Sequence, residues 1–174
     1  MKIKLHLYYI CWIIFIINSC KTTHNQNYIS IAEQWQKKKI SFPHNDQSNS
    51  IIYDSLNRKN PYKIIRYVDS TNCLICNLLL PRWETFYEQL PSVVPIHFFI
   101  HAKGNKELLH QIKLENTHIN IHFDKNDSIN ILNTFPDDKK LQTFLVDSNN
   151  QIIIIGDPIL NPALQKLYFE AIIP

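Results

Sequence analysis

Cys73 and Cys76 have the residue type and the spacing for redox chemistry. They are separated by Leu74 and Ile75 and follow the segment 62–69, whose β-branched and aromatic residues predict a central strand. A helix is predicted to start at about residue 74, which puts both cysteines in its first turn. Residues three apart in a helix share one face, so the two sulfurs can form a disulfide after a small backbone adjustment.

The start of a helix gives the two thiols different roles. Unpaired amide hydrogens and the positive end of the helix dipole favour the thiolate of Cys73. We therefore expect Cys73 to attack a disulfide and Cys76 to resolve the mixed disulfide that forms. A permanent disulfide is the alternative, but closing so short a loop would stabilise the fold only modestly. The placement of the pair favours redox use.

The N-terminus has the pattern of an export signal. A short basic start precedes an uncharged apolar run over residues 5–17, which is too short to span a bilayer comfortably. The run ends with Ser19 and Cys20, and the chain then turns polar. This resembles a bacterial lipoprotein signal, and the resemblance implies that Cys20 is lipidated. An uncleaved anchor is the alternative; either one predicts a location in the cell envelope, facing the periplasm or the cell surface.

Export also decides which cysteines remain for chemistry. Cys11 falls within the leader and Cys20 would carry the lipid, so Cys73 and Cys76 are left. Exported compartments favour disulfides, and a lone close pair of cysteines fits an oxidisable dithiol better than half of a metal site.

Four histidines offer an alternative use for the cysteine pair. Two thiolates and two imidazoles could hold Zn or Cu in a tetrahedral site. No histidine is close to the cysteines in sequence, and histidines at strand ends are usually polar surface residues. Metal delivery is therefore kept as a less favoured alternative, and we predict neither a metal site nor a cofactor. The histidines concerned are His97, His101, His118 and His122.

Composition excludes several other classes of protein. The chain has 174 residues, 45% of them hydrophobic and 19% charged, which predicts one globular core. The net charge is +3, and no basic stripe interleaved with aromatic residues is present, so nucleic-acid binding is not predicted. Gly104 and Gly156 are the only glycines, which argues against phosphate-cradling loops.

From residue 62 onward, predicted strands and helices alternate. The predicted strands cover residues 62–69, 93–100, 119–123, 143–147 and 151–155. The predicted helices cover residues 74–90, 105–114 and 128–135, and a last helix opens at Asn161 and Pro162. The final two strands form a hairpin whose turn residues, 148–150, tolerate positive φ. This order predicts an α/β fold with a mixed sheet.

The order of these features resembles the thioredoxin-like superfamily. A strand leads into Cys-x-x-Cys and a helix, and Pro81 follows five residues after Cys76, where it should kink the helix. Segments 119–124 and 143–147 resemble the TlpA/ResA-like branch. The resemblance implies a thioredoxin-like fold, a central mixed β-sheet flanked by helices. It also implies a thiol-disulfide oxidoreductase that acts on protein disulfides or dithiols and is served by a membrane-linked reductant.

The predicted domain organisation follows from the leader and the resemblance. Residues 1–19 form the signal peptide and residues 20–27 the lipidated tether. Residues 28–61 are a helix and strand extension, and residues 62–174 are the thioredoxin-like domain.

Three positions differ from the family pattern. Asn72 replaces the usual tryptophan, Tyr67 stands at the position of the buried carboxylate, and Leu141 stands at that of the cis-proline. A trans peptide is predicted before Leu141, because a cis bond before a non-proline residue costs about 2.5 to 4 kcal/mol. Asp124 is expected either to assist proton transfer or to start the next helix. These differences motivate a second hypothesis, a binding or assembly lipoprotein that keeps the fold without turnover.

Overall fold

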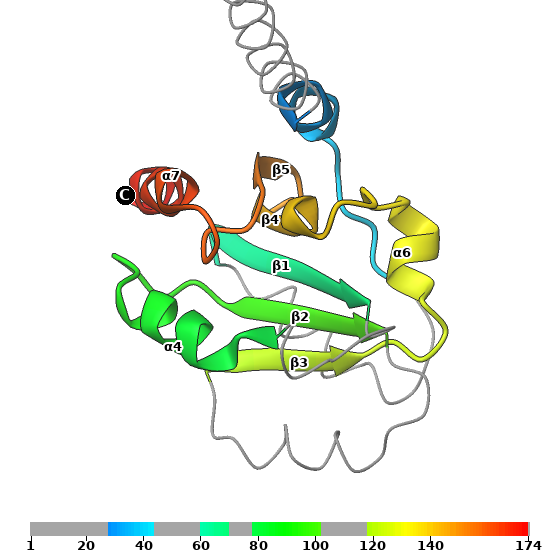
Figure 1. The fold of residues 1–174 in the computed structure, drawn as a ribbon, viewed down its shortest axis with the longest axis horizontal. Helices are drawn as coiled ribbons and strands as arrows, with labels where there is room; N and C mark the ends of the chain where they lie inside the picture. The colour runs from blue at the N-terminus through cyan, green and yellow to red at the C-terminus, as the bar shows by residue number, and fades with distance from the viewer. Residues whose placement is uncertain (1–27, 44–59, 70–77, 102–117, 174) are drawn as a thin grey trace, which may run out of the picture. The chain divides into compact units, whose positions relative to one another are not determined.

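The computed structural model describes residues 28–43, 60–69, 78–101 and 118–173 (Figure 1). The chain divides into two compact units, residues 1–35 and residues 36–174. In the first unit, residues 28–35 are helical. The second unit carries the strands β1 (Tyr62–Asp69), β2 (Ile96–His101), β3 (Ile119–Phe123), β4 (Thr143–Asp147) and β5 (Ile152–Ile155). It also carries the helices α4 (Leu80–Glu88), α6 (Ser128–Asn133), η1 (Lys139–Leu141) and α7 (Pro162–Ile172).

The five strands form one mixed sheet in the order β3-β2-β1-β4-β5 (Figure 1). β1 lies at its centre, where it pairs in parallel with β2 and antiparallel with β4. β2 and β3 are parallel, and β4 and β5 form the antiparallel hairpin. The predicted mixed sheet is therefore confirmed. Because β1 is bonded on both sides and has buried residues on both faces, its apolar run is nearly continuous.

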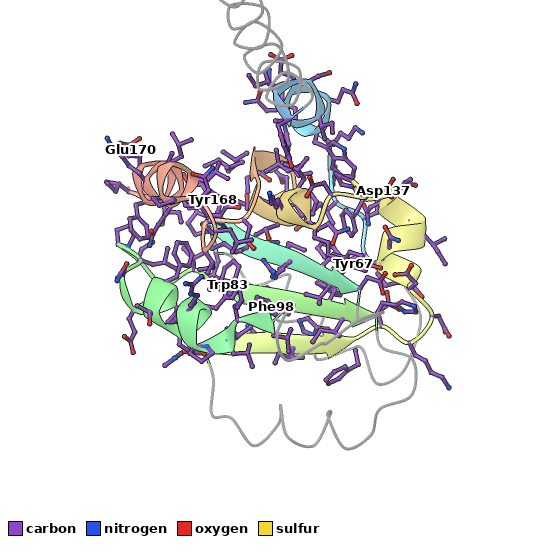
Figure 2. All side chains as sticks on the ribbon, in the orientation of Figure 1. Tyr67, Trp83, Phe98, Asp137, Tyr168 and Glu170 are labelled. Carbon is purple, nitrogen blue, oxygen red and sulfur yellow. The ribbon has the colours of Figure 1, made fainter. Side chains whose placement is uncertain are left out.

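The main core lies on the face of the sheet that α4 and α7 cover. Trp83 of α4 meets Phe98 of β2 edge to face, with ring centroids 5.2 Å apart (Figure 2). Phe86 of α4 packs against Tyr168 of α7, and Ile64 of β1 is fully buried in the same cluster. Aromatic side chains bury large areas and prefer edge-to-face contacts, so this cluster holds both helices on the sheet.

Within the described residues, the predicted helix over residues 74–90 is interrupted at Leu79, because Leu78 is helical and Leu79 is not. Leu79 has a left-handed backbone with φ 50°, and α4 begins at Leu80. Pro81 therefore lies in the first turn, where its missing N–H needs no partner. The interruption at Leu79 lies two residues before Pro81, close to the point where the sequence predicts a kink. Residues 74–77 lie outside the described residues.

β1, β3 and β4 have the predicted bounds, while the bounds of β2, β5 and α6 differ from the predictions by a few residues. β2 begins at Ile96, directly after Pro95, because proline cannot donate to a strand ladder. α6 ends at Asn133, since Thr134 is left-handed with φ 53°. Asn150 has φ 65° in the hairpin turn, as predicted. The Asn161 side chain accepts from the amides of Ala163 and Leu164 and so caps α7.

Residues 37–40 attach to the hairpin edge of the sheet. The Lys37 amide donates to the Ile152 carbonyl at 3.0 Å, and the Ile152 amide donates to the Lys38 carbonyl at 2.8 Å. The Ile40 amide donates to the Asn150 carbonyl at 2.9 Å, and the Ile40 side chain is buried. These bonds cover part of the β5 edge, which would otherwise offer unpaired backbone groups. The strand predicted over residues 51–56 and the helix over residues 105–114 lie outside the described residues.

Candidate functional site

The predicted redox residues border the described part of the chain. Cys73 and Cys76 lie outside the described residues, as does Cys20. The nearest described neighbours of the cysteine pair are Asp69, the last residue of β1, and Leu78. The candidate site is therefore formed, among the described residues, by the carboxyl end of β1 and the start of α4.

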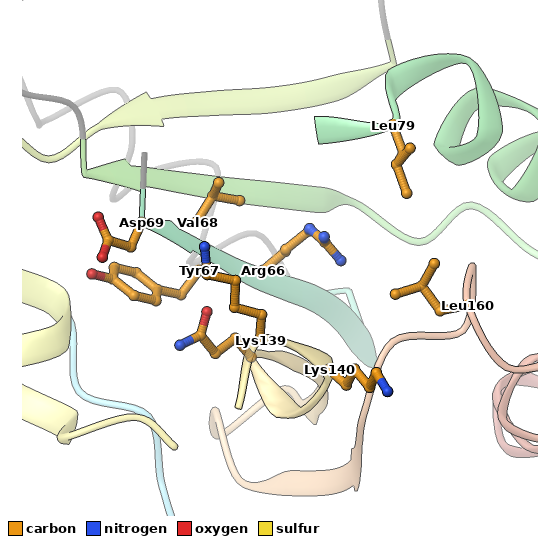
Figure 3. Close-up of a pocket in the computed structure, with 9 residues that line it drawn as sticks. Arg66, Tyr67, Val68, Asp69, Leu79, Lys139, Lys140 and Leu160 are labelled. Carbon is orange, nitrogen blue, oxygen red and sulfur yellow. The ribbon is translucent and has the colours of Figure 1, made fainter. Parts of the chain in front are cut away.

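A pocket of about 130 Å³ lies at this end of the sheet (Figure 3). Four segments contribute to it: the end of β1, the residue preceding α4, the region around η1, and the loop before α7. Asp69 and Leu79 both line the pocket. In the sequence, Asp69 precedes the segment that contains the cysteines and Leu79 follows it. The lining residues are Arg66, Tyr67, Val68, Asp69, Leu79, Lys139, Lys140, Gln142 and Leu160.

Arg66 brings a buried cation to the base of the pocket. Its Nη1 donates to Asp157 and, at 3.2 Å, to the Thr143 hydroxyl. The guanidinium carbon lies 5.4 Å from the ring centroid of Trp83 and 5.7 Å from that of Phe98. An opposite charge, a hydroxyl and two aromatic faces together offset the cost of taking this cation out of water.

Tyr67 occupies the position at which the resemblance implied a buried carboxylate. Its hydroxyl donates to Asp127 Oδ1 at 2.7 Å, and its ring packs against Phe135. Burial, together with the bond to Asp127, raises the pKa of Tyr67 far above its usual value. Tyr67 is thus a neutral hydrogen-bond donor and cannot accept a proton at neutral pH.

Asp124 holds the start of α6. Its Oδ2 accepts the Ile129 amide at 2.7 Å, which satisfies one of the otherwise unpaired amides in the first helical turn. Its backbone carbonyl lies 3.0 Å from Nδ1 of His101. The N-cap position of α6 belongs to Asp127, and Asp124 supports the helix start only through this side-chain bond. A part of Asp124 in proton transfer stays a prediction.

Leu141 lies in η1 with its side chain buried. Its amide donates to the Asp138 carbonyl at 2.8 Å, and the next residue is joined to β1, since the Tyr67 amide donates to the Gln142 carbonyl at 2.9 Å. The described residues contain no cis peptide bond, in agreement with the trans peptide predicted before Leu141.

The four histidines do not gather into one site. His97 and His122 are buried and pair with each other, with Nδ1 and Nε2 2.9 Å apart. His118 pairs with Glu84 at 2.9 Å on the surface, and His101 contacts Asp124 as described above. Within the described ranges, no group of three or more His, Cys, Asp or Glu side chains is arranged to hold a metal ion.

The burial of His97 and His122 contradicts the expectation that these histidines are polar surface residues. His97 has no exposed surface and His122 only 8%. The sequence signal for this burial was the nearly continuous apolar run in β2, which indicates a strand covered on both faces. A strand covered on both faces buries every residue it contains, so His97, which lies between Ile96 and Phe98, is buried as well.

Comparisons with known proteins give a fold and no sequence family. No protein-family model matches the chain, and no curated protein matches it in sequence. Among solved structures, a proposed thiol:disulfide interchange protein DsbE from Chlorobium tepidum matches with a TM-score of 0.54 and 14% identity, over 79% of this chain and 97% of the other. The chain has a thioredoxin-like fold. At this identity the likeness establishes the fold alone.

Two further structures resemble the thioredoxin-like fold of this chain. StoA from Bacillus subtilis matches with a TM-score of 0.45 and 19% identity, over 63% of this chain and 83% of the other. The thioredoxin domain of a thiol-disulfide oxidoreductase from Bacteroides vulgatus matches with a TM-score of 0.48 and 14% identity, over 66% and 83%. The sheet order of the described residues and the match to the Chlorobium tepidum structure confirm the predicted fold class, a central mixed sheet flanked by helices.

The predicted leader and tether, residues 1–27, lie outside the described residues. Where the structure describes the chain, no helix has both the length and the apolar character needed to cross a bilayer.

Proposed function

We propose that this protein is a thiol-disulfide oxidoreductase of the cell envelope, anchored by a lipid on Cys20. The observation that carries the proposal is the position of Cys-x-x-Cys between the central strand β1 and helix α4 of a thioredoxin-like fold. In this proposal residues 1–19 are removed, residues 20–27 are the tether, and residues 28–61 extend the domain formed by residues 62–174.

Chain length supports a role for the pocket beside β1. An extended chain advances at most about 3.6 Å per residue. Cys73 is four residues from Asp69, so it lies within about 14 Å of the end of β1 along the chain. Cys76 is two residues from Leu78, a limit of about 7 Å. Because Asp69 and Leu79 both line the pocket, a partner bound there would be within the reach that the chain allows to both thiols.

The proposed reaction transfers two electrons from the protein to a partner disulfide. The Cys73 thiolate attacks one partner sulfur, forming a mixed disulfide and releasing the other sulfur as a thiolate. The Cys76 thiolate then attacks Cys73, which frees the second partner thiol and leaves a Cys73–Cys76 disulfide. A membrane-linked dithiol reductant returns the pair to its reduced form.

Trapping of the thiols tests this proposal. Protein equilibrated in graded glutathione buffers and then alkylated should change from reduced to oxidised within the range that cells maintain. Cys76→Ser should accumulate mixed disulfides in cells, because its second step is lost, whereas a Cys73→Ser, Cys76→Ser variant should form none. A pair that stays fully oxidised or fully reduced over that range could not turn over.

A second candidate is a binding or assembly lipoprotein that retains the fold without turnover. The bond between Tyr67 and Asp127 favours it, because the expected proton-accepting carboxylate is replaced by a neutral hydroxyl. This hypothesis predicts that the Cys73→Ser, Cys76→Ser variant keeps its partners and its cellular function. Loss of function in a folded double variant would exclude it.

A further inference from the structure

We propose that the pocket beside β1 binds an aliphatic side chain of a partner polypeptide whose neighbouring residues are acidic, with Lys139 and Lys140 contacting the carboxylates. The proposal names a substrate class for the site above and rests on the proposed function, because a bound polypeptide becomes a substrate only if the cysteine pair turns over.

Three aliphatic side chains contribute to the wall of the pocket, beside charged and polar ones. Val68 is buried, Leu79 lies at the start of α4, and Leu160 is 50% exposed at the loop before α7. Figure 3 shows the Arg66 side chain directed toward the space between Leu79 and Leu160. A cavity of about 150 Å³ lined by apolar side chains holds a molecule the size of benzene. A pocket of about 130 Å³ therefore suits one branched aliphatic side chain.

The charges at the pocket favour an anionic partner. Arg66 is matched by Asp157, so its charge attracts a ligand only weakly. Lys139 and Lys140 are exposed, and within the described part of the chain neither makes an ion pair with a carboxylate. Asp69 is the one acidic residue in the lining. Asp138, whose Oδ1 accepts the Lys140 amide at 2.9 Å, adds a negative charge beside the lysines. Among the lining residues themselves the two lysines outnumber the one acid, and this excess of positive charge favours acidic neighbours of the bound side chain.

The backbone around the lysines is held in place before a ligand arrives. The Asp157 amide donates to the Lys140 carbonyl at 2.9 Å, and the Tyr67 amide donates to the Gln142 carbonyl at 2.9 Å. The Gln142 side chain donates to the Pro136 carbonyl at 2.8 Å. A prearranged site loses less entropy on binding, so short peptides suffice as probes.

The probes are blocked tripeptides without cysteine, in which leucine is flanked by two glutamates, two glutamines or two lysines. Backbone amide shifts of Lys140 and Gln142 in the mature full-length protein report binding. We expect the glutamate peptide to bind about threefold to tenfold more tightly than the glutamine peptide, as two exposed ion pairs would give. Replacing its leucine by glycine should abolish the shifts.

Matched variants distinguish the effect of Lys139 and Lys140 on peptide binding from the effect of the net charge of the protein. Lys139→Gln, Lys140→Gln should remove the preference for glutamate over glutamine. Lys125→Gln, Lys166→Gln should keep it, because this control loses the same charge at exposed positions outside the pocket.

Each contrary result overturns the inference. Equal affinity for the three peptides, no shift with any peptide, or equal binding of the glycine peptide would each exclude an aliphatic and acidic ligand. Because the probes lack thiols, these outcomes leave the redox proposal intact. Conversely, failure of thiol trapping with peptide binding preserved would exclude only turnover.

Discussion

Nδ1 of His97 lies 2.9 Å from Nε2 of His122, and the two rings stack at 5.2 Å in the interior of the sheet. One nitrogen donates and the other accepts, so the contact requires that the imidazole at the accepting nitrogen be neutral. Burial and the neighbouring His122 and Lys63 lower the pKa of His97 to about 3. Burial lowers the pKa of His122 to about 4.

This pair predicts that the protein loses stability in mild acid. Because the folded pKa values lie below the usual 6.5, the unfolded chain binds more protons than the native state as the pH falls. Stability from the pair is complete above pH 6.5 and is lost as the pH falls toward 4 and then 3. Urea unfolding should show a loss of several kcal/mol over this range, since each unit of pKa shift corresponds to about 1.4 kcal/mol.

Variants identify the pair as the source of that acid sensitivity. A His97→Gln, His122→Gln variant should unfold with a shallower dependence on pH. His118→Gln, which removes an exposed pairing with Glu84, should retain the wild-type dependence. Identical pH dependence in all three proteins would contradict the prediction.

Removing Asp157 should destabilise the fold strongly. Asp157→Asn leaves the buried Arg66 cation without its counter-ion, a change that costs about 3 to 5 kcal/mol in buried pairs. Denaturant unfolding measures the loss. Glu170→Gln, which breaks only the exposed contact with Lys166, should cost less than about 1 kcal/mol. An Asp157→Asn protein as stable as this control would mean that Arg66 is solvated.

Substituting Tyr67 distinguishes a structural role of its hydroxyl from a role in proton transfer. Tyr67→Phe removes the bond to Asp127 and should lower the free energy of unfolding by about 1 to 2 kcal/mol. Since Tyr67 stays neutral, the pH profile of thiol-disulfide exchange should not move. Exchange rates measured over a range of pH check this, and a displaced profile would show that Tyr67 does take part in proton transfer.

Gly156 should not tolerate a side chain. Its φ is 120°, a backbone conformation that costs an L-residue roughly 1 to 3 kcal/mol, and a Cβ would lie 2.6 Å from Cδ1 of Leu164. Gly156→Ala should therefore lower the unfolding midpoint in urea. Adding Leu164→Ala would relieve the steric overlap but leave the backbone strain. The loss of unfolding free energy in the double variant should therefore be smaller than the sum of the losses in the two single variants. An unchanged unfolding midpoint in Gly156→Ala would contradict both the steric overlap and the backbone strain.

The sequence by itself determined the elements whose signals are local. The alternation of residues in 119–123 identified one strand, and the turn at Asn150 marked the hairpin that starts with residues 143–147. Asn161 with Pro162 marked the start of α7. Together with Cys-x-x-Cys, the order of these elements was enough to predict the thioredoxin-like fold. Local signals suffice here because propensity and capping act over a few residues.

Only the tertiary structure decided which distant residues meet. Arg66 and Asp157 are 91 residues apart, and His97 and His122 are 25 apart. Their contacts depend on strand order and register, which no local pattern encodes. The left-handed backbone of Leu79, which separates helical Leu78 from α4, likewise followed from no local pattern in the sequence. The pocket beside β1 combines residues from four separate segments, so its lysines and leucines become a site only when the sheet has formed.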